Sequence, residues 1–203
     1  MGRTSDARER LIVAVGQLFC ESGYHGTTID AICLRAGVRK GTFYHFFASK
    51  EELAIAALEA DHDGRRQVLE EIFSPARAPL ARLLAYCDYV YTRQRQLKQE
   101  HGHVPGCRLF TLGAEICMQE ARLRERVNRM LGDTVACLTA AIGDAIVAKD
   151  LETTDPAARA RCVFSLIQGA ITQARIADDP ELLRELPAQV FLVLGLKDVP
   201  RAA

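Results

Sequence analysis

The chain has 203 residues, is 49% hydrophobic and 26% charged, and balances its 26 Lys and Arg against 26 Asp and Glu. This composition is typical of a globular protein with enough apolar residues for two lobes, and it excludes a disordered or uniformly basic chain. Charge is uneven along the chain. Residues 1–50 hold seven basic and four acidic side chains, a net charge of +3, which leaves 19 basic and 22 acidic ones, a net charge of −3, in the rest.

Neither a targeting signal nor a membrane segment is expected. The first ten residues, MGRTSDARER, contain no apolar signal region, and the apolar run at 190–194 is far shorter than the roughly 20 residues that cross a bilayer. We therefore expect a cytoplasmic protein without a membrane partner. The seven cysteines, at 20, 33, 87, 107, 117, 137 and 162, form an odd set without a CxxC pair, which argues against a disulfide framework or a zinc ribbon.

Apolar residues recur at helical spacing along the chain, and no convincing alternating strand pattern appears. The seven prolines fall at the breaks between the helical segments. The sequence therefore predicts an all-α fold of about nine helices. We place them at 4–22, 28–36, 40–46, 50–73, 79–99, 106–118, 121–149, 156–177 and 181–196.

The segment 27–50, TTIDAICLRAGVRKGTFYHFFASK, has the pattern of two short helices joined by a tight turn. Ile29, Ile32 and Cys33 form the apolar stripe of the first helix, and Gly37 stands where a helix end needs a residue tolerant of positive φ. The second helix combines apolar positions with a polar face, on which Gly41 has no side chain and leaves the backbone accessible. Such a face fits the major groove of DNA.

The next helix begins with Ser49-Lys50-Glu51-Glu52, the pattern of a capping box. In this arrangement the Ser49 hydroxyl accepts from a free amide of the first turn, and the Glu52 carboxylate reaches back to an amide that precedes the helix. We expect the helix that starts here to link the two lobes.

Together these motifs resemble the signature of TetR-type one-component transcriptional regulators. The resemblance implies a helix-turn-helix DNA-binding domain at 1–48 and an effector-binding and dimerisation domain at 49–203, acting as a homodimer on an inverted-repeat operator in double-stranded DNA. Two positions depart from the family pattern: Arg39 replaces a Ser or Thr helix cap, and Ala48 a common Pro. The matching positions are Thr28, Ile29, Ile32, Ala36, Gly37, Val38, Lys40, Gly41, Thr42, Phe43, Tyr44, Phe46, Ser49, Lys50, Glu51, Glu52 and Leu53.

Two kinds of DNA contact are expected from the first lobe. Cations, hydroxyls and helix amino ends bind phosphate oxygens, whereas side chains on the inner face of the second helix reach base edges. Thr42 and His45 are the base-edge candidates, joined by Arg39 or Lys40 if they turn inward, and Gly41 permits close approach, whereas Phe43 and Phe47 are expected in the core. The phosphate candidates are Arg3, Thr28, Arg39, Lys40, Tyr44 and Lys50.

A dimer is expected, because one short recognition helix reads too few base pairs to select a genomic site alone. Small residues that allow close approach and apolar residues on the last two helices make these helices the expected dimer surface. The alternative is that these side chains close the core of the monomer. The small and apolar residues concerned are Gly169, Ala170, Ala174, Ala177, Leu182, Leu183, Leu186, Val190 and Leu194.

Cys107 is the sharpest candidate for a sensor. It follows Pro105-Gly106 at an expected helix start, with Arg108 beside it, and amides and cations of this kind favour a reactive thiolate. The Gly106-Cys107 pair at this helix start also resembles a subgroup of TetR-type regulators that respond through reactive cysteines. A purely structural role for Cys107 stays open, as does a metal site with His101 and His103 that would lack a fourth ligand.

A noncovalent apolar effector enclosed by the helices from 79 to 177 is the more ordinary possibility. The lining candidates are Cys87, Phe110, Cys117, Phe164 and Gln168. In either case we expect the effector to favour a dimer whose two DNA-binding domains no longer match the operator spacing, with the helix that starts at Ser49 as lever.

Catalysis is not expected, because the chain contains no GxSxG, HExxH, GxxxxGK[ST] or GxGxxG motif, and no cofactor is implied. Three alternatives remain open. They are an enzyme whose activity does not depend on the helix-turn-helix residues, a helical module that binds DNA without sequence preference, and an activator in place of a repressor.

Overall fold

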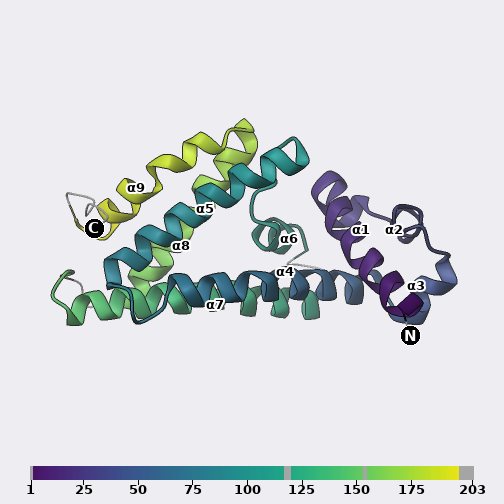
Figure 1. Ribbon diagram of the computed structural model, residues 1–203, viewed down its shortest axis with the longest axis horizontal. Coiled ribbons are helices and arrows are strands. Elements are labelled where there is room, and N and C mark those ends of the chain that lie inside the picture. The colour runs from purple at the N-terminus through teal and green to yellow at the C-terminus, as the bar shows by residue number, and fades with distance from the viewer. Residues whose placement is uncertain (1, 117–119, 153–154, 197–203) are drawn as a thin grey trace. The chain divides into compact units, whose positions relative to one another are not determined.

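The computed structural model describes residues 2–116, 120–152 and 155–196, with backbone only at 2–5, and every regular element in these ranges is helical (Figure 1). The predicted all-α fold is therefore confirmed. The elements are α1 (Gly2–Gly26), α2 (Ile29–Ala36), α3 (Lys40–Phe46), α4 (Lys50–Ile72), α5 (Pro79–His101), α6 (Arg108–Ile116), α7 (Ala121–Val147), α8 (Pro156–Ala177), the 3₁₀ turn η1 (Pro180–Glu185) and α9 (Leu186–Val193).

Most observed helix boundaries lie within two residues of the predicted ones, and three helices differ for a structural reason. The first helix does not stop at 22 but runs to Gly26 across a break at Gly23, which has φ 68°. The helix predicted from 106 begins at Arg108, because Gly106 has φ 76°, and its predicted end at 118 lies outside the described residues. The single helix predicted at 181–196 is divided at Leu186, where Pro187 has no amide to continue the hydrogen bonds of η1.

Two compact units make up the chain. Unit 1 comprises Met1–Arg65 and Arg108–Met130, and unit 2 comprises Arg66–Cys107 and Leu131–Ala203, so that α4 and α7 each contribute to both. Unit 1 thus contains α6 and the start of α7 in addition to the helix-turn-helix. The functional boundary expected at residue 48 is a different kind of division and stays a prediction.

The core of unit 1 explains why α1, α2 and α3 form one group (Figure 1). Phe43 is fully buried and Phe47 is 4% exposed, which confirms their expected structural role. Burying such a ring contributes about 2–3 kcal/mol. The other buried members are Leu11, Ala14, Val15, Leu18, Ile32, Cys33, Ala36 and Leu53.

The core of unit 2 joins α5, the C-terminal part of α7, α8, η1 and α9. Arg82 is buried in this unit, and its guanidinium donates to the carbonyls of Arg77 and Pro75 and to the Asp144 carboxylate. A buried guanidinium is tolerated because these acceptors satisfy it. Arg82 thereby fastens the loop between α4 and α5 to α7.

One described helix, α7, is long and apolar enough to cross a membrane by length and composition alone. Part of this helix is buried within the protein, with Leu123 and Val127 buried in unit 1 and Leu138 and Ile142 buried in unit 2, whereas Val147 at its end is 84% exposed.

Candidate nucleic-acid interface

The helix-turn-helix is shaped by contacts within a short stretch of chain. The Thr28 hydroxyl accepts from the Ala31 amide at 3.1 Å and caps α2. At the other end, Gly37 adopts φ 62°, and the amides of Gly37 and Val38 donate to the carbonyls of Leu34 and Cys33 at 3.2 and 3.0 Å. A left-handed residue at this position reverses the chain and directs it into α3.

Helix α3 presents the polar face that the sequence predicts. Arg39 precedes it as the N-cap and makes no side-chain capping bond, as its departure from the family pattern implies. Tyr44 is 52% exposed, Thr42 is half-buried, and the aromatic residues Phe43 and Phe47 face the core. Outward-facing candidates are therefore Arg39, Lys40, Gly41, Tyr44 and His45, all exposed.

Lys40 already has a partner on this face. Its ammonium lies 2.9 Å from the Asp30 carboxylate, and both side chains are more than half exposed. The hydrogen bond to Asp30 and the charge of Asp30 raise the pKa of Lys40. A phosphate that binds Lys40 must therefore compete with Asp30, although an exposed ion pair of this kind is weak.

Lys50, expected on a phosphate, has partners within the protein, and its contact with DNA stays a prediction. Its Nζ donates to the carbonyls of Tyr24 and Thr27 at 2.8 and 2.9 Å and lies 4.2 Å from the centre of the Tyr24 ring. Burial lowers the pKa of Lys50, and the charges of Glu115 and Glu120 partly oppose this effect. The ammonium is thus committed to the corner between α1 and α2, and the side chain of the phosphate candidate Arg3 lies outside the described part of the chain.

The predicted capping box of α4 is present, with one difference. The Glu52 amide donates to the Ser49 hydroxyl at 3.2 Å, as expected. The difference is that the Glu52 carboxylate accepts from the Ala48 amide, at 2.9 Å, and not from the amide of the cap residue Ser49. Both groups therefore stabilise the start of the helix that links the two units.

The segment before Cys107 is held by distant parts of unit 2. Gln94 of α5 forms two bonds with Gly106, accepting from its amide at 3.1 Å and donating to its carbonyl at 3.3 Å. The Asp178 carboxylate accepts from the Val104 amide at 2.8 Å. Cys107 itself is half-buried against the core of unit 2 and directly precedes α6.

Gly106 is required at its position for two reasons. Its φ of 76° is disfavoured for residues with a side chain, and an added Cβ would lie 3.0 Å from Cδ of Arg175 on α8. The backbone beside Cys107 therefore packs closely on the Arg175 stem. Sequence reasoning did not identify Gln94, Arg175 or Asp178 as supports of this segment, because they lie 12 to 74 residues away.

Three other thiols are placed where ionisation is disfavoured. Burial raises the pKa of Cys87 to about 12, and it also raises the pKa of Cys33 and Cys137. Thiols that stay protonated react slowly with electrophiles. The metal alternative at Cys107 gains no support, since no group of three or more His, Cys, Asp or Glu side chains in the described ranges could hold a metal ion.

The predicted effector-lining residues belong to both units. Cys87, Phe164 and Gln168 lie in the core of unit 2 or pack beside it, whereas Phe110 lies in unit 1 and is 40% exposed. Cys117 lies outside the described residues. Gln168 is only 4% exposed, and its Oε1 has no hydrogen-bond partner among the described residues.

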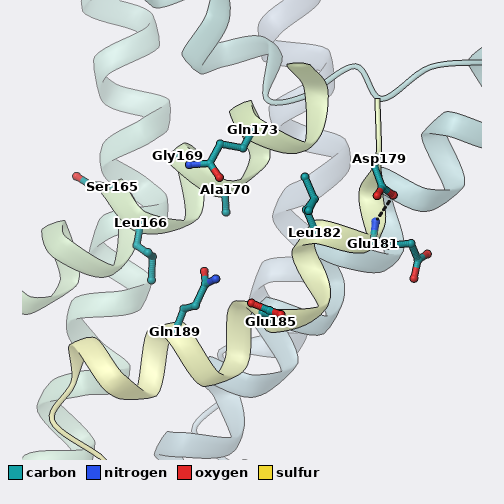
Figure 2. Close-up of a pocket in the computed structure, with 10 residues that line it drawn as sticks. All are labelled: Ser165, Leu166, Gly169, Ala170, Gln173, Asp179, Glu181, Leu182, Glu185 and Gln189. Carbon is teal, nitrogen blue, oxygen red and sulfur yellow. Dashed lines mark hydrogen bonds between the residues drawn. The ribbon is translucent and has the colours of Figure 1, made fainter. Parts of the chain in front are cut away.

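A hollow of about 600 Å³ opens between α8, η1 and α9. In Figure 2, Leu166 and Ala170 of α8 point into the same space as Leu182 of η1 and Gln189 of α9. Gly169 on the same face has open space where a Cβ would be, so a backbone from outside could approach closely there. The small and apolar residues expected at a dimer surface are thus divided, with Gly169, Ala170 and Leu182 at this hollow and Leu183, Leu186 and Val190 in the core.

Comparisons with known proteins agree with this geometry. Residues 11–57 match the family of bacterial regulatory proteins called tetR, and residues 79–190 match a tetracyclin repressor-like C-terminal domain. The HTH-type transcriptional repressor NemR of Escherichia coli K12 is 30% identical over 194 residues, 94% of each chain.

Two solved structures of bacterial regulators are similar to this chain along most of its length. The reduced form of E. coli NemR superimposes with a TM-score of 0.78 at 28% identity, covering 96% of this chain and all of that one. The regulatory protein TetR from Rhodobacter sphaeroides gives a TM-score of 0.79 at 27% identity, covering 91% of this chain and 96% of that one. This chain therefore belongs to the TetR family of helix-turn-helix transcriptional regulators.

Proposed function

We propose that this regulator is a cytoplasmic repressor that binds an inverted-repeat operator as a homodimer and leaves it when Cys107 is modified. The observation that carries DNA binding is the exposed face of α3, where Lys40, Tyr44 and His45 stand outward while Phe43 anchors the helix from behind. Cations and a phenol on such a face bind phosphates, and His45 is positioned to meet base edges. Repression is the activity named for the NemR relative.

The face formed by α8, η1 and α9 supports the homodimer. Ile176 is 81% exposed and Leu192 is 74% exposed, while Leu182 lines the hollow between the helices. Apolar side chains that gather on one exposed face mark an interaction surface. A second copy related by a two-fold axis would cover this face and present two α3 helices to the two halves of an inverted repeat.

Cys107 is the proposed switch because it directly precedes α6 at the end of a braced segment. An α,β-unsaturated carbonyl compound serves as the model electrophile. The Cys107 thiol loses its proton to water, the thiolate forms a C–S bond to the β-carbon, and the α-carbon takes a proton from water as the C=C bond is lost. The adduct adds bulk where the backbone packs against the Arg175 stem. The crystallised NemR relative is described as a reduced form, so a redox state is defined for that protein.

Release from DNA requires a coupling free energy between the modified cysteine and the operator. Helix α4 is the proposed lever, since it begins at the capping box beside the helix-turn-helix and continues into unit 2. A modified protein would then favour a spacing of the two α3 helices that no longer fits the operator.

A noncovalent effector is the second candidate, and Gln168 favours it. A buried amide oxygen without a partner is costly, and a ligand with an O–H or N–H donor would satisfy it. Such a ligand would release the operator in the Cys107→Ser variant as well. A Gln168→Leu variant should weaken that release and leave release by electrophiles intact.

DNA binding is tested by fluorescence anisotropy with DNA from upstream of the gene and with a scrambled duplex. The expected result is a preference of several kcal/mol for one inverted repeat, of the order usual for specific binding. Equal affinity for both duplexes with a steep salt dependence would instead identify a nonspecific DNA-binding module.

The switch is tested by limited alkylation of the unliganded protein at pH 7 with methyl vinyl ketone, followed by peptide mass spectrometry. Cys107 should be modified first, well before Cys33, Cys87 and Cys137, whose raised pKa values disfavour the thiolate. Preferential modification of a different cysteine would contradict the assignment.

A further inference from the structure

The carboxylate of Glu115, in the last turn of α6, bonds to the backbone of α1. Its Oε2 accepts from the Tyr24 amide and its Oε1 from the His25 amide, both at 2.9 Å. These two amides directly follow the break at Gly23, where the chain leaves regular helical geometry. An ionised carboxylate with two amide donors makes a strong and directional contact. We call this contact the Glu115 bridge.

Gly23 and Glu115 fit one another closely. A Cβ added at Gly23 would lie 2.9 Å from both carboxylate oxygens, closer than real contacts allow. Gly23 also has φ 68° and ψ −179°, a conformation that residues with a side chain rarely adopt. The glycine is therefore needed twice, to form the break and to admit the carboxylate.

The other end of α6 also meets a glycine of α1. An added Cβ at Gly16 would lie 3.2 Å from Nη1 of Arg108, whose Nη2 is 3.8 Å from the Asp61 carboxylate. Gly16 and Gly23 are seven residues apart, as are Arg108 and Glu115, and seven residues span about 10.5 Å of helix. Helix α6 therefore runs beside α1 in a fixed register over two turns, and a shift along its axis would break the Glu115 bridge.

The backbone held by Glu115 supports the helix-turn-helix. The Thr27 hydroxyl donates to the Gly23 carbonyl at 2.7 Å, and Lys50 donates to the carbonyls of Tyr24 and Thr27. The next residue, Thr28, is the cap of α2. The position of Glu115 is thus connected through hydrogen bonds to the start of α2 and to the start of α4.

We infer that Glu115 is a coupling residue through which α6 sets the position of α2 and α3, in addition to the link through α4. The inference rests on the proposed function in that α6 begins one residue after Cys107. Glu115 is exposed, so water replaces its bonds when α6 shifts. The contact can therefore be made and broken reversibly, whereas Phe43 and the rest of the core stay packed.

The test is amide hydrogen exchange of the full chain, free and bound to its operator, because binding at one site must affect the other reciprocally. In the wild type, operator binding should slow exchange in α6 by about tenfold or more. In Glu115→Ala the amides of Tyr24 and His25 should exchange faster in the free protein, and the slowing in α6 should be lost. Glu115→Gln keeps one acceptor oxygen and should give an intermediate result.

Glu125→Gln is the matched control, since Glu125 is an exposed helical carboxylate that pairs with Arg129 four residues later. It should behave as the wild type. Unchanged exchange at Tyr24 and His25 in Glu115→Ala, or full retention of the operator-dependent slowing in α6, would overturn the inference. Neither readout uses an electrophile, so failure of the cysteine switch would be seen separately, as wild-type protein that stays on its operator after alkylation.

Discussion

The helix-turn-helix and the segment before Cys107 are built in opposite ways. In the first, the shaping bonds are local, from Ala31 to Thr28 and from Val38 to Cys33. In the second, Val104 bonds to a side chain 74 residues away, on Asp178. The helix-turn-helix is therefore shaped by its own sequence, whereas the proposed sensor segment depends on α5 and α8. A local element keeps its shape while other parts move, and a segment fastened to distant helices transmits a change to them.

The largest expected effect separates the core of the helix-turn-helix from its surface. Phe43→Ala removes a fully buried ring and should destabilise the protein by about 3–5 kcal/mol. Thermal or urea denaturation measures this change, with DNA binding lost as unit 1 unfolds. A loss below 1 kcal/mol would contradict the packing described for α3.

A smaller effect is expected in unit 2 from Arg82→Ala. The substitution leaves the carbonyls of Pro75 and Arg77 without their donor, and the Asp144 carboxylate, which is about half exposed, returns to water. We expect a destabilisation of about 2–3 kcal/mol, below the value for a fully buried ion pair because Asp144 stays hydrated. Urea denaturation with Arg66→Ala, an exposed arginine, as control tests this value.

The buried thiol of Cys87 predicts a pH dependence specific to unit 2. Its pKa is raised to about 12 by burial, so between about pH 9 and 12 the unfolded thiol is ionised while the folded one is not. Stability is therefore retained below pH 9 and lost above it, by about 1.4 kcal/mol per pH unit. Denaturation at pH 8 and pH 10 should show a smaller decrease in Cys87→Ala than in the wild type. Equal decreases would show that this thiol is not buried as described.

The smallest expected effect is on the DNA-binding surface. Tyr44→Phe should leave stability unchanged, since the ring stays half exposed, but it removes the hydroxyl expected on a phosphate. We expect operator affinity to fall by about 1–1.5 kcal/mol, or roughly tenfold. Anisotropy with operator DNA measures it, and an unchanged affinity would place Tyr44 away from the phosphates.

Sequence reasoning was reliable where structure is local. The turn at Gly37, the burial of Phe43 and the start of α4 at Ser49 all follow from neighbouring residues. It did not predict the carbonyl partners of Lys50, because these depend on the break at Gly23.

It also missed the residues that make long-range contacts. Gln94, Glu115 and Asp178 are polar residues in helices or at a helix end, and nothing in their local sequence distinguishes them from solvated positions. The glycines that these contacts require are the available sequence signal. Gly23 and Gly106 mark places where the backbone changes direction and a distant side chain approaches closely.

Operator release is the most direct test of the proposed switch. Reduced wild-type protein and Cys107→Ser are bound to labelled operator DNA, treated with methyl vinyl ketone, and followed by fluorescence anisotropy. We expect release of the wild type and retention of Cys107→Ser. Retention of both proteins, or release of both to the same extent, would contradict it.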